Sequence, residues 1–200
     1  MKNFLKSVLI FIMFGVLAIS CSSDSTDSST KPCTPIACLN GGTSNVNCGC
    51  DCPQGFSGSN CSTQITPTLI KITQIKVIDF PMTTTNGNQW DQVAIGNSVR
   101  PDIFPILSLG SSILLQGAAV QDAVNTNIYT WTPTQPISLT PSQFTSQLSL
   151  NLYDEDTTEN VFMGGFNFYV YNSTGGFPAS KIINTATSPY KFELILSYIW

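Results

Sequence analysis

The sequence lacks histidine entirely and is poor in charge, with 8 Lys or Arg and 12 Asp or Glu among 200 residues. Without imidazole, the chain cannot build a Ser/His/Asp triad, a Cys/His dyad or a histidine-ligated zinc site. Charged residues make up 10% of the chain, against roughly 25% in an average soluble domain. The net charge of -4 argues against a nucleic-acid partner, because phosphate binding needs clustered Lys and Arg. The 14 Gly and 12 Pro are typical of an exported, turn-rich β protein.

The apolar run near the N-terminus, residues 8–19, is too short to span a membrane comfortably as a helix. Because Lys2 and Lys6 give it a positive start, residues 1–20 are predicted to be a signal peptide. Residues 21–31 form a polar run with no apolar residue to bury. This composition predicts a flexible tether.

The apolar run ends in the residues LAISC, positions 17–21. This ending resembles a bacterial lipobox, although Ile19 stands where a small residue is usual. The resemblance implies that diacylglycerol is attached to the Cys21 thiol, which makes the protein a lipoprotein. Ser22, rather than Asp, follows it, which implies the outer membrane of a Gram-negative bacterium, with exposure on the cell surface. The alternative is ordinary cleavage near Ser20, which would leave a free thiol.

Six further cysteines lie close together in a segment with almost no aliphatic core. They are Cys33, Cys38, Cys48, Cys50, Cys52 and Cys61. So short a segment folds only with covalent help. An even number of cysteines after an export signal predicts a disulfide framework, and counting alone leaves fifteen connectivities. A zinc site made by Cys48, Cys50 and Cys52 is the alternative, and it requires thiolates that stay reduced.

Two motifs in this segment belong to one known pattern. Residues 38–43 are CLNGGT, and residues 50–61 are CDCPQGFSGSNC. Together they resemble an EGF-like domain, which would cover residues 32–62. The resemblance implies three bridges: Cys33 to Cys48, Cys38 to Cys50, and Cys52 to Cys61. Gly55 and Gly58 are expected where the last hairpin turns tightly and needs a positive φ.

Residues 63–200 contain no cysteine and show short apolar segments separated by Gly, Pro, Asn and Thr. The clearest segment, 190–200, places apolar residues at alternate positions, namely Tyr190, Phe192, Leu194, Leu196, Tyr198 and Trp200. Such alternation predicts a strand with one buried face. Further strands are predicted at residues 75–78, 103–109, 112–117, 127–132, near Ser138, at 148–152 and at 166–171. The chain is therefore predicted to be mostly β, with an eight-stranded antiparallel sandwich over residues 63–200.

Acidic residues are rare in this part, and several stand beside strand ends. Asp154 and Asp156 follow the strand predicted at 148–152, so their carboxylates can lie on one side of a turn, as calcium requires. Asp91 and Asp102 flank the loop between the first two predicted strands. If these loops share one end of the sandwich, four carboxylates converge and repel one another, and a divalent cation would relieve the repulsion. The alternative is that they are ordinary solvated turn residues.

Four segments, in this order, resemble parts of a C2 domain. They are residues 75–81, IKVIDFP; residues 100–104, RPDIF; residues 150–156, LNLYDED; and residues 163–165, MGG. The resemblance implies a C2-like fold with calcium ligands at Asp91, Asp102, Asp154 and Asp156. The fifth acid of the family is missing from the last loop, where Asn160 or Glu159 would substitute.

These features together predict a non-catalytic, cell-envelope-anchored binding lipoprotein. Its C2-like domain would bind calcium and bridge to an anionic lipid, glycan or protein. The calcium ion would have to supply the attraction to this partner, because the lysines are scattered along the sequence. The alternative is a metal-independent structural or adhesion module on the cell surface that uses exposed aromatics such as Trp90, Tyr169 or Trp200. A hydrolase using Asp154 or Asp156 as a carboxylate pair is disfavoured, because two acids in one turn cannot readily flank a scissile bond. No organic cofactor is expected.

Overall fold

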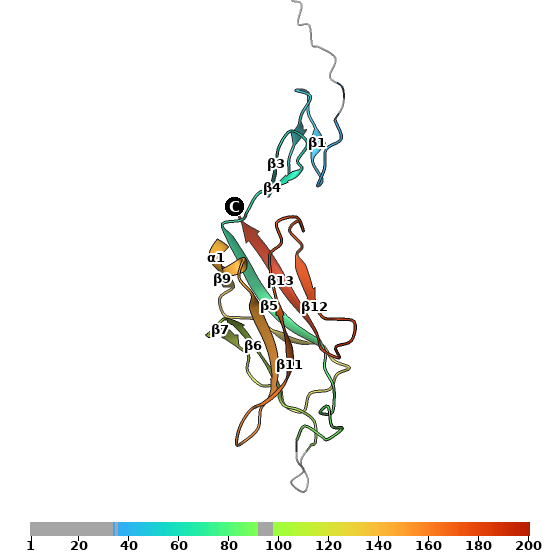
Figure 1. Cartoon of the computed structure of the whole chain (residues 1–200), viewed down its shortest axis with the longest axis vertical. Helices are drawn as coiled ribbons and strands as arrows, with labels where there is room; N and C mark the ends of the chain where they lie inside the picture. The colour runs from blue at the N-terminus through green and yellow to red at the C-terminus, as the bar shows by residue number, and fades with distance from the viewer. Residues whose placement is uncertain (1–33, 35, 92–97) are drawn as a thin grey trace, which may run out of the picture. The chain divides into compact units, whose positions relative to one another are not determined.

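Figure 1 shows a computed structural model of the protein, which describes residues 34, 36–91 and 98–200. Residues 34–200 belong to one structural unit. The predicted signal peptide, the tether, Cys21 and Cys33 lie outside the described residues. No helix among the described residues is long and apolar enough to cross a membrane.

The cysteine-rich segment consists of two very short hairpins. Strands β1 (Thr43–Ser44) and β2 (Cys50–Asp51) form the first, and β3 (Phe56–Ser57) and β4 (Thr63–Gln64) form the second. Gly55 and Gly58 have φ values of 90° and 92°, as predicted for the tight turns of this region.

Disulfides join Cys38 to Cys50 and Cys52 to Cys61, two of the three pairs that the EGF-like resemblance implies. Cys48 is also disulfide-bonded. The alternative of a zinc site at Cys48, Cys50 and Cys52 is wrong, because none of the three is a free thiolate.

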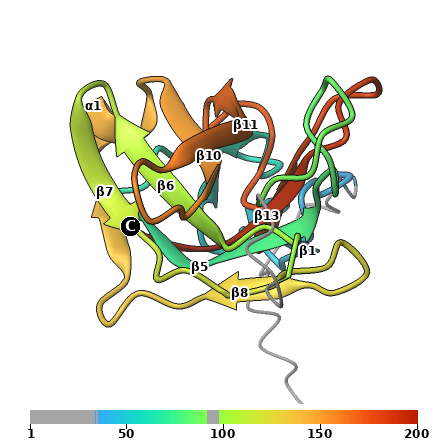
Figure 2. The same ribbon diagram turned by 90° about the horizontal axis from the view of Figure 1, so that it is seen from below.

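The remaining strands form two antiparallel sheets. They are β5 (Leu69–Asp79), β6 (Ile103–Leu109), β7 (Ser112–Gln116), β8 (Tyr129–Trp131), β9 (Ile137–Leu139), β10 (Leu148–Asp154), β11 (Val161–Phe168), β12 (Ser180–Ile183) and β13 (Lys191–Ile199). One sheet has the order β11-β10-β6-β7, and the other has the order β12-β13-β5-β8, with β9 also paired to β5. Figure 2 shows β6, β10 and β11 stacked over β5, β8 and β13. The predicted mostly β sandwich is confirmed.

The sandwich has nine strands among the described residues rather than the predicted eight. The additional strand is β12, since β8 and β9 correspond to the strands predicted at 127–132 and near Ser138. Those two lie one after the other along β5: β8 pairs with Ile75–Val77, and β9 with Ile70–Ile72. Pro133 and Pro136 separate these two short strands, and proline cannot donate to a ladder. The two prolines therefore keep β8 and β9 apart as two short strands, as predicted.

Alternation predicts the buried faces well. On β13, Phe192 and Leu194 are fully buried and Leu196 is 5% exposed, while the neighbouring Ser197 is exposed. The matching residues of β10 point into the same core, which contains side chains from both sheets. Burial of these apolar faces holds the two sheets together.

The segment predicted as a strand at 166–171 is displaced, since β11 spans Val161–Phe168. Gly164 and Gly165 interrupt the run of residues that favour strands in this segment. Because glycine has no side chain, neighbouring groups approach its backbone closely at both positions. A Cβ on Gly164 would collide with the Tyr190 ring, and one on Gly165 would collide with the Leu150 carbonyl. Strand β12 was not predicted, because four residues are too few to show a clear alternation.

The short helix α1 (Pro141–Phe144) was also not predicted. The sequence nevertheless carries its signal. Thr140 precedes a proline at the first helical position, and the backbone N–H of Thr140 donates to Gln143 Oε1 at 2.9 Å. This is the arrangement of a capping box.

Candidate metal centre

Three acidic side chains meet at one end of the sandwich. Asp91, Asp154 and Asp156 each offer a carboxylate oxygen, and these three atoms lie within 4.8 Å of one another. Asp154 is the last residue of β10, and Asp156 lies two residues beyond it. Asp91 comes from the connection between β5 and β6, next to Trp90, whose indole Nε1 donates to the Pro81 carbonyl at 2.8 Å. We call Asp91, Asp154 and Asp156 the acidic cluster.

The position of Asp154 follows from the alternation of its strand. Leu148, Leu150 and Leu152 point into the core with no exposed surface, and Asp154 occupies the next position on the same face. It is likewise 0% exposed, and among the described residues it is the one charged side chain that is buried. A carboxylate at such a position is costly unless hydrogen bonds or a cation compensate for the lost water.

Hydrogen bonds compensate for only half of this carboxylate. Asp154 Oδ1 accepts from the backbone N–H of Asp102 at 2.6 Å. Asp154 Oδ2 is buried and has no hydrogen-bond partner among the described residues. The backbone N–H of Glu155 donates to the Asp102 carbonyl at 2.8 Å, so the start of β6 and the end of β10 are fastened together here. The local backbone thus holds Asp154 in place but leaves one oxygen without a partner.

Burial and neighbouring negative charges destabilise the ionised forms of Asp154 and Asp91. Burial raises the pKa of Asp154 to about 6; the Asp102 N–H opposes this rise, and the charges of Asp91, Asp156 and Asp102 add to it. Burial also raises the pKa of Asp91, and repulsion by Asp102, Asp156 and Asp122 raises it further. Either a proton or a divalent cation would relieve this repulsion.

The structure brings three of the predicted ligands into one group and places the others differently. Asp102 is not one of the three, and its Oδ1 accepts from the backbone N–H of Asp122 at 2.7 Å. Its carboxylate is still near enough to raise the pKa of both Asp91 and Asp154. Asn160 and Glu159 are exposed residues just before β11, and their part in binding stays a prediction.

Exposed apolar side chains lie next to the acidic cluster. Val161 pairs with Asp154 across the β10–β11 ladder, and Phe162 pairs with Tyr153. Val161 is 41% exposed and Phe162 is 55% exposed. Phe162 packs edge-on against Tyr153, with ring centroids 5.6 Å apart, so the ring is supported although much of it faces solvent. The sequence analysis did not identify these two residues, because they precede the strand predicted at 166–171.

No protein-family model matches the chain, and no curated protein matches it. Solved structures do. A structure described as a C2 domain matches with a TM-score of 0.44 and 14% identity, over 66% of this chain and 98% of that one. A structure of the two C2 domains of extended-synaptotagmin 2 matches with a TM-score of 0.40 and 17% identity, over 72% of this chain and 45% of that one.

Human GIVD cytosolic phospholipase A2 matches with a TM-score of 0.40 and 14% identity, over 65% of this chain but 16% of that one. This chain therefore covers under half of the length of the last two proteins. All three likenesses concern the fold. What the described residues establish is an antiparallel β-sandwich that carries a partly buried acidic cluster.

Proposed function

We propose that this protein is a non-catalytic lipoprotein, anchored at the cell envelope through Cys21, whose sandwich binds calcium at the acidic cluster. The observation that carries the proposal is Asp154 Oδ2, a buried carboxylate oxygen with no hydrogen-bond partner among the described residues. Its carboxylate groups with those of Asp91 and Asp156. A bound cation would supply the missing partner, offset the burial that raises the pKa of Asp154, and cancel the repulsion by neighbouring carboxylates that adds to this rise.

The ligand set favours calcium over softer metals. Carboxylate oxygens are hard ligands, and calcium takes six to eight oxygens in a flexible arrangement. The cluster supplies oxygens from three side chains, and water or Asn160, in the exposed segment that follows Asp156, would complete the shell. Zinc and copper prefer thiolate or imidazole, but the described cysteines form disulfides and the chain has no histidine.

The first test is a thermal melt of oxidised chain 22–200, in EDTA and then across a calcium series. Calcium at tenfold above its Kd should add about 1.4 kcal/mol, or roughly 3 to 6 °C for a domain of this size. The double variant Asp154→Asn/Asp156→Asn should lose the shift. Asp79→Asn, an exposed acid at the end of β5 and outside the cluster, should keep it.

A flat response up to millimolar calcium would contradict the calcium site. The protein would then be a metal-independent display module, the alternative that the sequence also allows.

The partner we propose for the calcium-loaded cluster is an anionic lipid surface. Val161 places exposed apolar surface opposite Asp154, and Phe162 adds exposed apolar surface at the next position of β11. Apolar surface near a bound cation suits a boundary between headgroups and acyl chains. The chain itself carries a net charge of -4, so attraction to an anionic surface has to come from the ion.

Vesicle co-sedimentation tests this partner. Vesicles with phosphatidylserine should retain the protein in calcium but not in EDTA, and neutral phosphatidylcholine vesicles should retain little in either. Phe162→Asn should weaken retention by about tenfold, while the calcium-dependent melting shift stays as in the wild type. Equal retention of this variant would remove Phe162 from the contact, and retention in EDTA would contradict an ion-mediated one.

A further inference from the structure

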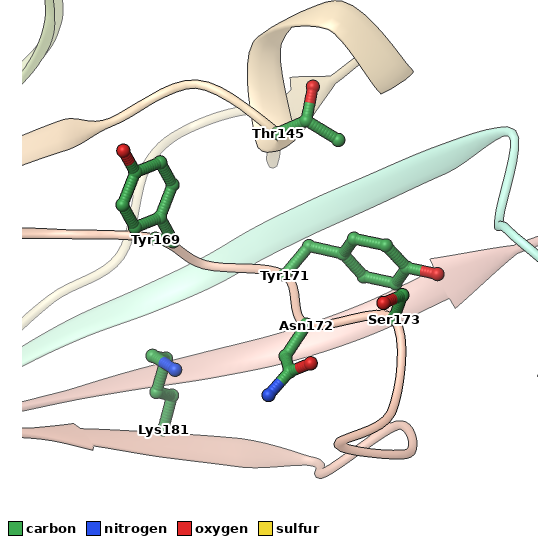
Figure 3. Close-up of a pocket in the computed structure, with 6 residues that line it drawn as sticks. All are labelled: Thr145, Tyr169, Tyr171, Asn172, Ser173 and Lys181. Atoms are coloured by element: carbon green, nitrogen blue, oxygen red, sulfur yellow. The ribbon is translucent and has the colours of Figure 1, made fainter.

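A second feature lies away from the acidic cluster. It is a pocket of about 520 Å³, shown in Figure 3. Its lining residues are Thr145, Tyr169, Tyr171, Asn172, Ser173 and Lys181. Thr145 ends the α1 turn, the four central residues follow β11, and Lys181 lies on β12.

The pocket and the acidic cluster are at opposite ends of the same strands. Across the β10–β11 ladder, Leu148 pairs with Phe168 at one end, and Asp154 pairs with Val161 at the other. Tyr169 directly follows the first pair. Seven residues of strand separate the two ends, or about 20 Å. A ligand in the pocket would therefore act independently of the cluster.

The chain that forms the pocket wall is well supported. The Tyr171 ring packs on Phe144 with centroids 5.0 Å apart. Gln64 Nε2 donates to the Asn172 carbonyl at 3.0 Å, and Gln64 Oε1 accepts from the Gly176 N–H at 2.8 Å. The backbone N–H and hydroxyl of Thr174 both donate to Asn172 Oδ1, at 3.0 and 3.1 Å. These contacts fix the wall before any ligand arrives, which lowers the entropy cost of binding.

Two groups that line the pocket, the Tyr169 hydroxyl and the Lys181 ammonium, make no polar contact with the other described residues. Tyr169 is 54% exposed, and within the described part of the chain its hydroxyl has no partner. Trp90 and Trp200, the other aromatics predicted to face a partner, are not available in this way: Trp90 donates to Pro81, and Trp200 packs on Phe177. Lys181 forms no ion pair with any described residue, whereas Lys76 is paired with Glu193 at 3.0 Å.

We propose that this pocket binds a uronic acid unit of an acidic polysaccharide. An exposed tyrosine ring offers a flat apolar surface to the C–H face of a pyranose ring. The amide nitrogen of Asn172 and the hydroxyl of Ser173 can donate to sugar hydroxyls. The Thr145 hydroxyl donates to the Pro141 carbonyl at 2.7 Å and can accept from a sugar hydroxyl. Lys181 is the cation of the pocket and pairs with the sugar carboxylate. The volume is within the ~300 to 1,000 Å³ usual for small-ligand sites. This site needs neither the acidic cluster nor calcium.

The test compares two oligosaccharides that differ by their carboxylates. Titration calorimetry in EDTA, with oxidised chain 22–200, would use hexagalacturonate and a galactose hexamer with the same linkage. Hexagalacturonate should bind about tenfold more tightly than the neutral hexamer. Tyr169→Ala should weaken both by about tenfold, and Tyr169→Phe should change neither by much, because the ring face is kept. Lys181→Gln should remove the preference for the acidic sugar, and Lys181→Arg should keep it.

Two controls separate this proposal from the calcium site. Lys191→Gln, on β13 and outside the pocket, should leave binding unchanged. Asp154→Asn/Asp156→Asn should also leave it unchanged, so that failure of the calcium site and failure of the pocket give different results. The proposal is overturned if neither oligosaccharide binds at millimolar concentration, if Tyr169→Ala and Lys181→Gln have no effect, or if binding requires calcium.

Discussion

Acidification from pH 8 to pH 4 is expected to raise the contribution of Asp154 to the stability of the calcium-free protein by about 2 kcal/mol. The pKa of Asp154 is about 6 in the folded chain, above the ~3.9 of an unfolded Asp. Between these two values the folded state holds a proton that the unfolded state has released. The free energy of unfolding therefore falls as the pH rises through this window, and it levels off above the folded pKa.

The matched variant for this measurement is Asp154→Asn. An Asn at this position keeps an Oδ1 acceptor for the Asp102 N–H, presents its amide to Asp91 and Asp156, and does not titrate. Urea unfolding of both proteins in EDTA, at several pH values, isolates the Asp154 contribution as the difference between the two curves. The variant should be the more stable protein at pH 8. Parallel curves would show that the buried carboxylate does not control this pH dependence.

The same proton links stability to metal binding. A carboxylate must lose its proton before it can bind a cation, so metal affinity falls where the ligand is protonated. Since the pKa of Asp154 is about 6, the calcium affinity that we propose should weaken below that pH and change little between pH 7 and pH 8. The cluster would then be filled in a neutral, calcium-rich exterior and emptied by mild acid.

The alternation of apolar residues accounts for the part of this fold that could be predicted. It identified the buried faces of β10 and β13, because each strand packs one face against a single core. The same alternation also places Asp154 on the buried face of β10. The sequence therefore indicated a buried carboxylate at Asp154. Its position beside a predicted turn instead favoured the interpretation of an exposed turn residue.

The parts of the metal centre and of the pocket that could not be predicted depend on contacts between segments that are distant in the sequence. Asp91 reaches the cluster through the connection between β5 and β6, which has no periodic pattern to read. Asp102 has the expected location, but its side chain accepts from a backbone N–H twenty residues away. The pocket at Tyr169 and Lys181 combines three separate segments, and no local motif indicates such a combination.

Leu150→Ala is expected to have the largest effect on stability, at about 2 to 5 kcal/mol. Leu150 is fully buried in the middle of β10, between Leu107 of β6 and Phe166 of β11. The substitution removes buried methyl groups and leaves a cavity that the paired strands on both sides prevent from closing. This loss is a large share of the ~5 to 15 kcal/mol typical of a whole domain. Urea unfolding in EDTA measures it.

The neighbouring Ser149→Ala is the control, because Ser149 points to the other face of β10. This substitution removes one hydrogen bond, the one between the Ser149 and Ser108 hydroxyls at 2.8 Å. Its cost should be about 1 kcal/mol. If the acidic cluster binds calcium as proposed, calcium should stabilise Leu150→Ala by the same increment as the wild type, because that increment depends on calcium concentration and Kd alone. A smaller increment in Leu150→Ala would mean that the core of β10 also sets the geometry of Asp154, four residues further along the strand.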